Sequence, residues 1–275
     1  MDDGRLNSRP IGVFDSGLGG LTTVRELCRL LPEEDIVYFG DTGRVPYGSR
    51  SRETIVKYAR QDVAFLRTFD LKTIVIACGT VSTTALDVLA AENPIPVLGV
   101  VAPAARAAAR ATRSGSIGLI GTQASIRSGA YERLIRAENP AARVLAQPCP
   151  LFVPLVENGR FRPGDVVIET VAAEYLAPLR EAGVDTLVLG CTHYPLLEKV
   201  IGAYMGPEVR LINSGAEGAR AAADCLRERD ALAGPGRGSC RCFVSDRQED
   251  FSRLASTFLG WDVAQAVEQV DISQY

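Results

Sequence analysis

Short continuous apolar runs alternate with longer amphipathic stretches, and this alternation limits the folds open to the chain. The runs predict strands at Ile11–Phe14, Ile36–Phe39, Thr73–Ala77, Val97–Val101, Ile117–Ile120, Val144–Ala146, Thr186–Leu189 and Val209–Ile212. The stretches between them predict helices at Leu21–Leu30, Arg52–Phe69, Thr83–Ala91, Gly129–Ala137, Gly164–Ala182 and Ala216–Arg229. Strands that are apolar on both faces must be covered on both faces. The pattern therefore predicts an α/β protein with parallel-type sheets flanked by helices.

An internal repeat suggests that this architecture occurs twice. TIVIAC at 73–78 matches TLVLGC at 186–191, and IGVFDS at 11–16 matches IGLIGT at 117–122. Two further pairs follow in the same order, Pro46–Gly48 with Pro154–Gly159 and Pro96–Gly99 with Arg210–Asn213. Four ordered matches at nearly constant spacing predict two similar α/β domains. After a Gly/Pro-rich loop at Gly234–Ser239, a strand at Arg241–Val244 and a helix at Asp250–Leu259 extend one of them.

Charge and hydropathy exclude several classes of protein. Thirty Lys and Arg against 33 Asp and Glu give a net charge of −3, so we expect no nucleic-acid partner and no anionic membrane surface. The longest stretch without a charged residue, Thr73–Leu86, is shorter than the roughly 20 residues of a membrane-spanning helix. The polar start, MDDGR, lacks the apolar core of a secretory signal.

Residue counts restrict the chemistry further. His193 is the one histidine, which argues against zinc sites built from two or three histidines, and we expect no metal. The three lysines, Lys57, Lys72 and Lys199, lie in helical patterns or before an apolar run, so we do not expect a pyridoxal enzyme. Seven scattered cysteines in a chain of this size indicate reduced thiols and a cytoplasmic protein.

Two cysteines occupy equivalent positions in the repeat. Cys78 and Cys191 each follow an apolar strand directly, where parallel α/β sheets bind their ligands. A buried cysteine is more often a small hydrophobic residue than a reactive one. A repeat-related pair, however, could face one substrate from opposite sides, which is what a cofactor-independent racemase or epimerase requires. A thiol suits this proton transfer because its ordinary pKa of about 8.5 is within reach of neutrality.

Two neighbouring groups could assist these thiols. His193 lies two residues after Cys191, close enough in sequence to tune the thiol or to hold its proton. Asp15 ends the first strand and could bind a substrate ammonium, act as a base behind Cys78, or simply cap the following helix. The glycines after Asp15 match neither the dinucleotide-binding pattern nor the P-loop.

Five segments carry a resemblance to the aspartate/glutamate racemase family, and within it to the glutamate racemases. They are FDSGLGGL from Phe14, YFGDTGRVPYGS from Tyr38, VIACGT from Val75, PLVENG from Pro154 and LGCTHYPL from Leu189. The resemblance covers roughly residues 10–262. It implies cofactor-free interconversion of L- and D-glutamate, supply of D-glutamate for peptidoglycan, and a homodimer. It also implies two α/β domains, residues 1–101 with 213–275 and residues 102–212, and an active site between them.

The resemblance also assigns roles to residues. Cys78 and Cys191 match the two catalytic thiols, and Asp15, His193 and Glu157 match assisting acid/base positions. The expected substrate-binding positions are Asp15, Ser16, Pro46, Tyr47, Gly48, Gly79, Thr80, Thr122, Thr192 and His193.

One position departs from the family pattern. Family members usually have Asn after the first catalytic cysteine, where this chain has Gly79. A lost amide hydrogen bond to a charged substrate would cost about 1.5–3 kcal/mol unless another group replaces it. This departure leaves two alternatives open, a racemase of aspartate or another amino acid and a weakly catalytic protein that binds an amino acid or a partner protein.

Overall fold

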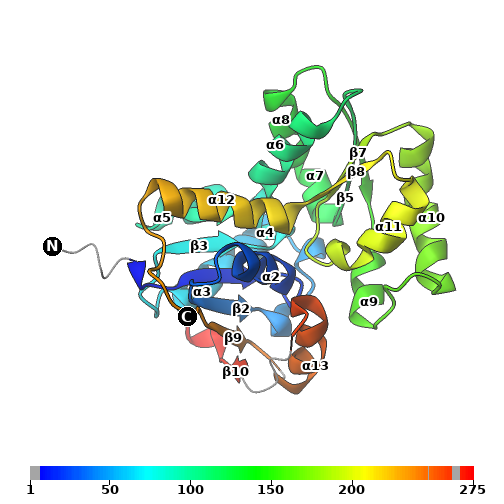
Figure 1. Cartoon of the computed structure of the whole chain (residues 1–275). Coiled ribbons are helices and arrows are strands. Elements are labelled where there is room, and N and C mark those ends of the chain that lie inside the picture. Colours follow the sequence, from blue (N-terminus) through cyan, green and yellow to red (C-terminus); the bar gives the residue numbers. More distant parts are fainter. Residues whose placement is uncertain (1–6, 247, 262–266) are drawn as a thin grey trace.

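The computed structural model describes residues 7–246, 248–261 and 267–275, and the polar residues 1–5 lie outside this range. These residues form two parallel sheets (Figure 1). The first has the order β10-β9-β2-β1-β3-β4 and the second β6-β5-β7-β8. The first-sheet strands are β1 Ile11–Asp15, β2 Ile36–Gly40, β3 Thr73–Ile76, β4 Val97–Gly99, β9 Cys240–Val244 and β10 Val267–Gln269. The second-sheet strands are β5 Ser116–Gly121, β6 Arg143–Pro148, β7 Thr186–Leu189 and β8 Arg210–Asn213.

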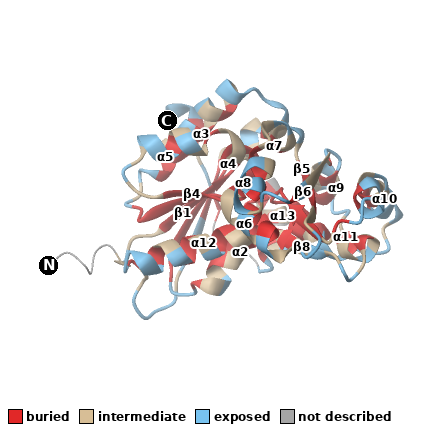
Figure 2. Ribbon diagram, turned by 90° about the horizontal axis from the view of Figure 1, so that it is seen from above, coloured by how far each residue is buried: buried red, intermediate tan, exposed pale blue. Residues whose placement is uncertain are grey.

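Helices cover both faces of each sheet, as the apolar runs require. On the first sheet, α2 (Leu21–Leu30), α12 (Ser214–Glu228) and α13 (Gln248–Leu259) share a core with one face. The helices α3 (Arg52–Leu66), α4 (Gly79–Thr84) and α5 (Leu86–Glu92) lie on the other, and Figure 2 shows the buried strands between these layers. On the second sheet, α6 (Val101–Ala111) and α8 (Ala130–Glu138) face α9 (Phe152–Glu157), α10 (Val166–Glu181) and α11 (Glu198–Met205) across the strands.

The repeat predicted from the sequence is present in the topology. Strands β2-β1-β3-β4 and β6-β5-β7-β8 occur in the same spatial order. Their registers also agree, because Ile11 pairs with Thr73 in the first sheet and Ile117 pairs with Thr186 in the second. Cys78 and Cys191 therefore follow matching strands at matching heights.

Several elements differ from the sequence prediction at their ends or in kind. The strand expected to reach residue 101 stops at Gly99, and Val101 instead begins α6, an alanine-rich helix that the pattern did not predict. The helix expected at 83–91 is two helices, α4 and α5, which meet at Ala85, a residue with a non-helical φ of −124°. The helix expected at 52–69 ends at Leu66. Strand β10 and the helices α9 and α7 (Gln123–Ser128) were also not predicted, and of α11 only the helical pattern around Lys199 was.

No helix in the described part of the chain is long and apolar enough to span a bilayer.

Candidate active site

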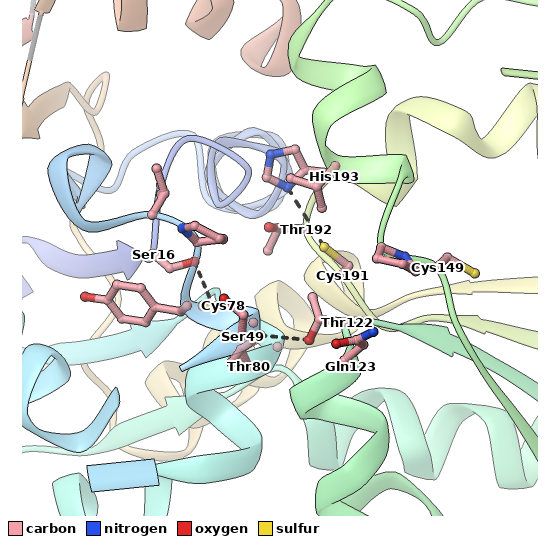
Figure 3. Close-up of a pocket in the computed structure, with 18 of the residues that line it drawn as sticks. Ser16, Ser49, Cys78, Thr80, Thr122, Gln123, Cys149, Cys191, Thr192 and His193 are labelled. Atoms are coloured by element: carbon pink, nitrogen blue, oxygen red, sulfur yellow. Dashed lines mark hydrogen bonds between the residues drawn. The ribbon is translucent and has the colours of Figure 1, made fainter. Parts of the chain in front are cut away.

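A cavity of about 380 Å³ lies where the carboxyl ends of the two sheets meet. Figure 3 shows Ser16, Cys78 and Thr80 approaching from the first sheet, and Thr122, Cys191, Thr192 and His193 from the second. Both cysteines line the cavity and both are almost fully buried, at 5% and 7% exposed. The structure thus brings the repeat-related thiols to one site. Of the site residues predicted from the sequence, every one lines this cavity except Asp15.

Cys78 sits at the N-terminal end of α4, two residues after the end of β3. Its Sγ lies 3.3 Å from the Ser16 hydroxyl. Burial, and to a lesser degree the nearby Asp15 carboxylate, raises the pKa of the Cys78 thiol to about 12. Cys78 is therefore a protonated thiol near neutral pH.

Cys191 belongs to a chain of three groups. Its Sγ is 3.9 Å from His193 Nδ1, and His193 Nε2 is 2.9 Å from Glu157 Oε1. Burial alone would lower the pKa of His193, but its hydrogen bonds to Cys191 and Glu157 outweigh burial and raise that pKa to about 10. An imidazolium at this position stabilises a thiolate on Cys191. The two thiols thus differ in their surroundings, although the strands that carry them match.

Asp15 lies behind the cavity wall and is not among the described residues that line it. It is 1% exposed, and its Oδ2 accepts a hydrogen bond from the Gly17 N–H at 3.1 Å. Burial raises the pKa of its carboxyl group, while the charge of His193 opposes this rise. Asp15 is thus placed to act on the Cys78 thiol electrostatically, and a direct bond to a substrate ammonium would require it to be uncovered first.

Groups from the two sheets touch one another around the cavity. The Thr80 and Thr122 hydroxyls are 3.0 Å apart, and Thr22 Oγ1 donates to the Thr192 carbonyl at 2.9 Å. Gly19 lies so close to the second sheet that a Cβ on it would stand 2.3 Å from Thr192 Oγ1 and 2.5 Å from His193 Nδ1. This contact requires glycine in the turn after β1.

Comparisons with known proteins agree with this geometry. The family model described as Asp/Glu/Hydantoin racemase matches residues 14–222. The chain belongs to this racemase family. It is 49% identical over 253 residues to a glutamate racemase of Geobacter metallireducens, covering 92% of this chain and 93% of that protein.

Solved structures of the family superpose over nearly the whole chain. Glutamate racemase isoform RacE1 from Bacillus anthracis matches with a TM-score of 0.91 at 38% identity, covering 96% of this chain and 98% of that one. Glutamate racemase from Francisella tularensis, solved in complex with D-glutamate, matches with a TM-score of 0.90 at 37% identity, covering 98% of this chain and 100% of the other.

In this racemase-family chain, an ionic network fixes one wall of the cavity. Arg44 donates from Nε to Asp41 Oδ2 at 2.6 Å and from Nη2 to Asp62 Oδ1 at 2.8 Å, and both aspartates are fully buried. The Tyr47 hydroxyl donates to Asp41 and, at 3.2 Å, to Asp62. Burial and the Asp41 carboxylate raise the pKa of Asp62 well above its usual range. The network anchors the segment at 45–49, which includes Pro46, Tyr47 and Gly48.

This network was missed in the sequence analysis because Asp62 reaches it from α3. The one local signal was the spacing of Asp41 and Arg44, three residues apart in a quoted motif. Ten further residues line the cavity without having been predicted as site residues: Gly17, Val45, Ser49, Gln123, Cys149, Pro150, Val153, Pro154, Gly190 and Tyr194. The Cys149 sulfur points away from the other two thiols in Figure 3 and donates to the Gln147 carbonyl at 3.6 Å.

Gly79 makes a close contact between the sheets. A Cβ at this position would stand 2.5 Å from the carbonyl oxygen of Gly190, the residue that precedes Cys191. The backbone beside one thiol therefore packs directly against the backbone beside the other. Replacing Gly79 by any larger residue requires one of these two segments to shift.

Proposed function

We propose that this chain is a glutamate racemase that interconverts L- and D-glutamate without a cofactor and supplies D-glutamate for peptidoglycan. The observation that carries the proposal is the pair of buried thiols, Cys78 and Cys191, placed by matching strands around one cavity. Two acid/base groups on opposite sides of one carbon are the requirement for inverting it. The family membership and the glutamate racemases that resemble the chain support glutamate as the substrate.

The reaction transfers one proton at each face of the α-carbon. In one direction the Cys191 thiolate takes the α-proton, and the electron pair of the broken C–H bond remains on the substrate as a carbanion delocalised into its α-carboxylate. The Cys78 thiol then gives its proton to the opposite face, which leaves a Cys78 thiolate and a Cys191 thiol. The other enantiomer follows the same steps in reverse, and proton exchange resets the pair.

The surroundings of the thiols support these starting states. The imidazolium of His193, held by Glu157, stabilises the Cys191 thiolate, whereas Cys78 rests as a thiol because its pKa is about 12. Ser16, at 3.3 Å from Cys78 Sγ, supplies a hydroxyl that can hydrogen-bond the thiolate formed there after turnover. Asp15 acts from behind as a positioning and charge-balancing group.

The carboxylates of the substrate would be bound without a guanidinium or ammonium group, because no Arg or Lys is among the described residues that line the cavity. The available donors include the hydroxyls of Thr80, Thr122 and Thr192 and the backbone N–H groups of the adjoining turns. The side chains of Ser16, Ser49 and Gln123 add further donors. We further propose that the enzyme works in the cytoplasm as a homodimer, with domains formed by residues 1–101 with 213–275 and by residues 102–212.

The test is proton NMR of L-glutamate with the pure protein in D₂O and no added cofactor. We expect deuterium at the α-carbon and accumulation of D-glutamate. L-Aspartate and L-alanine in parallel samples test the alternative substrates that Gly79 leaves open. Exchange with aspartate but not with glutamate would refute the assignment of substrate, and exchange with neither would refute the activity.

A further inference from the structure

A second cavity, of about 440 Å³, lies beside the catalytic one between helices of the two sheets. From the first sheet it is lined by the start of α3 together with α4 and α5, and from the second by α7 and α8. Helices α4 and α7 pack against each other here, as Figure 2 also shows. Its lining shares no residue with the catalytic cavity, but Arg50 follows Ser49 and Ala124 follows Gln123, which both line the catalytic one. None of the residues that line this second cavity takes part in the proton transfers at the catalytic cavity.

The charges around this second cavity are unbalanced. Four guanidinium groups line it, those of Arg50, Arg52, Arg127 and Arg133, against the single carboxylate of Asp87. None of the four arginines forms an ion pair with a carboxylate in the part of the chain that the structure describes. Like charges gathered around one space repel each other, and an anion between them relieves that repulsion.

Two of the guanidinium groups hydrogen-bond to backbone carbonyls. Arg133 Nη1 donates to the Ser128 carbonyl at 2.7 Å, and Arg52 Nε donates to the Thr84 carbonyl at 3.4 Å. A guanidinium has five N–H donors, so each of these keeps four for a ligand. Arg52 is also the first residue of α3, a helix of 15 residues whose N-terminus carries partial positive charge.

We propose that this cavity binds a ligand carrying two or more linked phosphate groups. Arg50 and Arg52 would bind the phosphates from the side of the first sheet, and Arg127 and Arg133 from the side of the second. The planar donor pairs of arginine match phosphate oxygens, and four cations against one carboxylate call for a multiply charged anion. An amino acid fits less well, because its ammonium would have only Asp87 as a charged partner. Such a ligand would tie together the segments that carry Ser49 and Gln123.

Calorimetric titration of the full chain with inorganic pyrophosphate tests the site. Ionic strength is held constant with NaCl, because surface charge effects are screened over about 10 Å at 0.1 M salt. We expect saturable binding that weakens by roughly tenfold or more in R127Q/R133Q and also in R50Q/R52Q, since each pair removes half of the cation set. Thermal unfolding shows whether either double variant folds poorly. Because the two variants change different sides of the cavity, the other one still tests the site in that case.

The matched control is R110Q/R136Q, which removes two exposed arginines of α6 and α8 that lie outside the cavity. It should bind pyrophosphate within about twofold of the unaltered chain. Adenosine diphosphate in a parallel titration separates the sources of the phosphate. Equal affinity indicates the free anion, and tighter binding indicates a larger phosphorylated metabolite. The absence of saturable heat, or equal weakening in the control pair, would overturn the proposal whether or not the chain racemises glutamate.

Discussion

Replacing Glu157 by glutamine should move the alkaline limit of the enzyme without harming it at neutral pH. The Glu157 carboxylate, 2.9 Å from His193 Nε2, is one of the groups that raise the pKa of His193 to about 10. A carboxylate at such a distance raises the pKa of a histidine by about 1–3. Because the Glu157 side chain is 33% exposed, water screens part of this effect, and we expect a contribution of about 1–2 to the pKa of His193. In E157Q the pKa of His193 should therefore fall to about 8–9.

The direction in which activity changes with pH follows from the role of the His193 imidazolium. Below its pKa His193 is charged and stabilises the Cys191 thiolate, and above it this stabilisation is lost. At pH 7 the histidine is protonated in both proteins, so kcat/KM should agree within about twofold. At pH 9.5 the unaltered enzyme is still mostly protonated, whereas E157Q is mostly neutral, and kcat/KM should be roughly eightfold lower.

The assay is kcat/KM for L-glutamate from pH 6 to 10, which reports ionisations of the free enzyme and of the free substrate. The two proteins are compared as a ratio at each pH, because the titration of the substrate ammonium group then cancels. Cys78 does not obscure this limit, because its pKa of about 12 lies higher. E181Q, at the exposed end of α10, is the matched control and should keep the original profile. A profile for E157Q that is lower by the same factor at every pH would indicate structural damage, and an unmoved alkaline limit would refute the reasoning.

Four further substitutions test the rest of the site. C78S and C191S should each abolish racemisation, since a serine hydroxyl is far too weak an acid for this proton transfer; NMR detection of substantial D-glutamate with either would contradict the two-thiol mechanism. R44Q leaves two buried aspartates without their cation. We therefore expect the free energy of unfolding, measured in urea, to fall by about 3 kcal/mol and KM to rise. An unchanged KM would show that this network does not support substrate binding. G79N must displace the Gly190 carbonyl, so steady-state kinetics should show a lower kcat/KM; a gain would mean that the restored amide outweighs the displacement.

The central strands and their carboxyl ends could be predicted from sequence because both depend on local patterns. Apolar runs of strand length, each followed by a small or polar residue, placed β1, β3, β5 and β7 within a residue or two. The repeat then related Cys78 to Cys191 before any contact was known.

The remaining features depend on tertiary contacts. Val101 suits a strand by propensity, yet it begins a helix, because the chain crosses there from the first sheet to the second. Arg44 and Asp62 meet only after α3 has packed on the sheet, and the burial of Asp15 depends on the turn that follows β1. Arg50 and Arg52 of the second cavity come from one stretch of the chain and Arg127 and Arg133 from a distant one, so no local pattern could have grouped all four.

The shared register of the two sheets has a thermodynamic counterpart. The enantiomers of glutamate have equal free energies in water, so kcat/KM must be the same for both at equilibrium, whatever the enzyme. The chain meets this condition with two halves of one pattern, yet places a histidine and a glutamate beside one sulfur and a serine and an aspartate beside the other. That asymmetry can change kcat and KM separately in each direction, but kcat/KM stays equal in the two directions. Any substitution here, however one-sided its position, must therefore slow both directions by the same factor in kcat/KM.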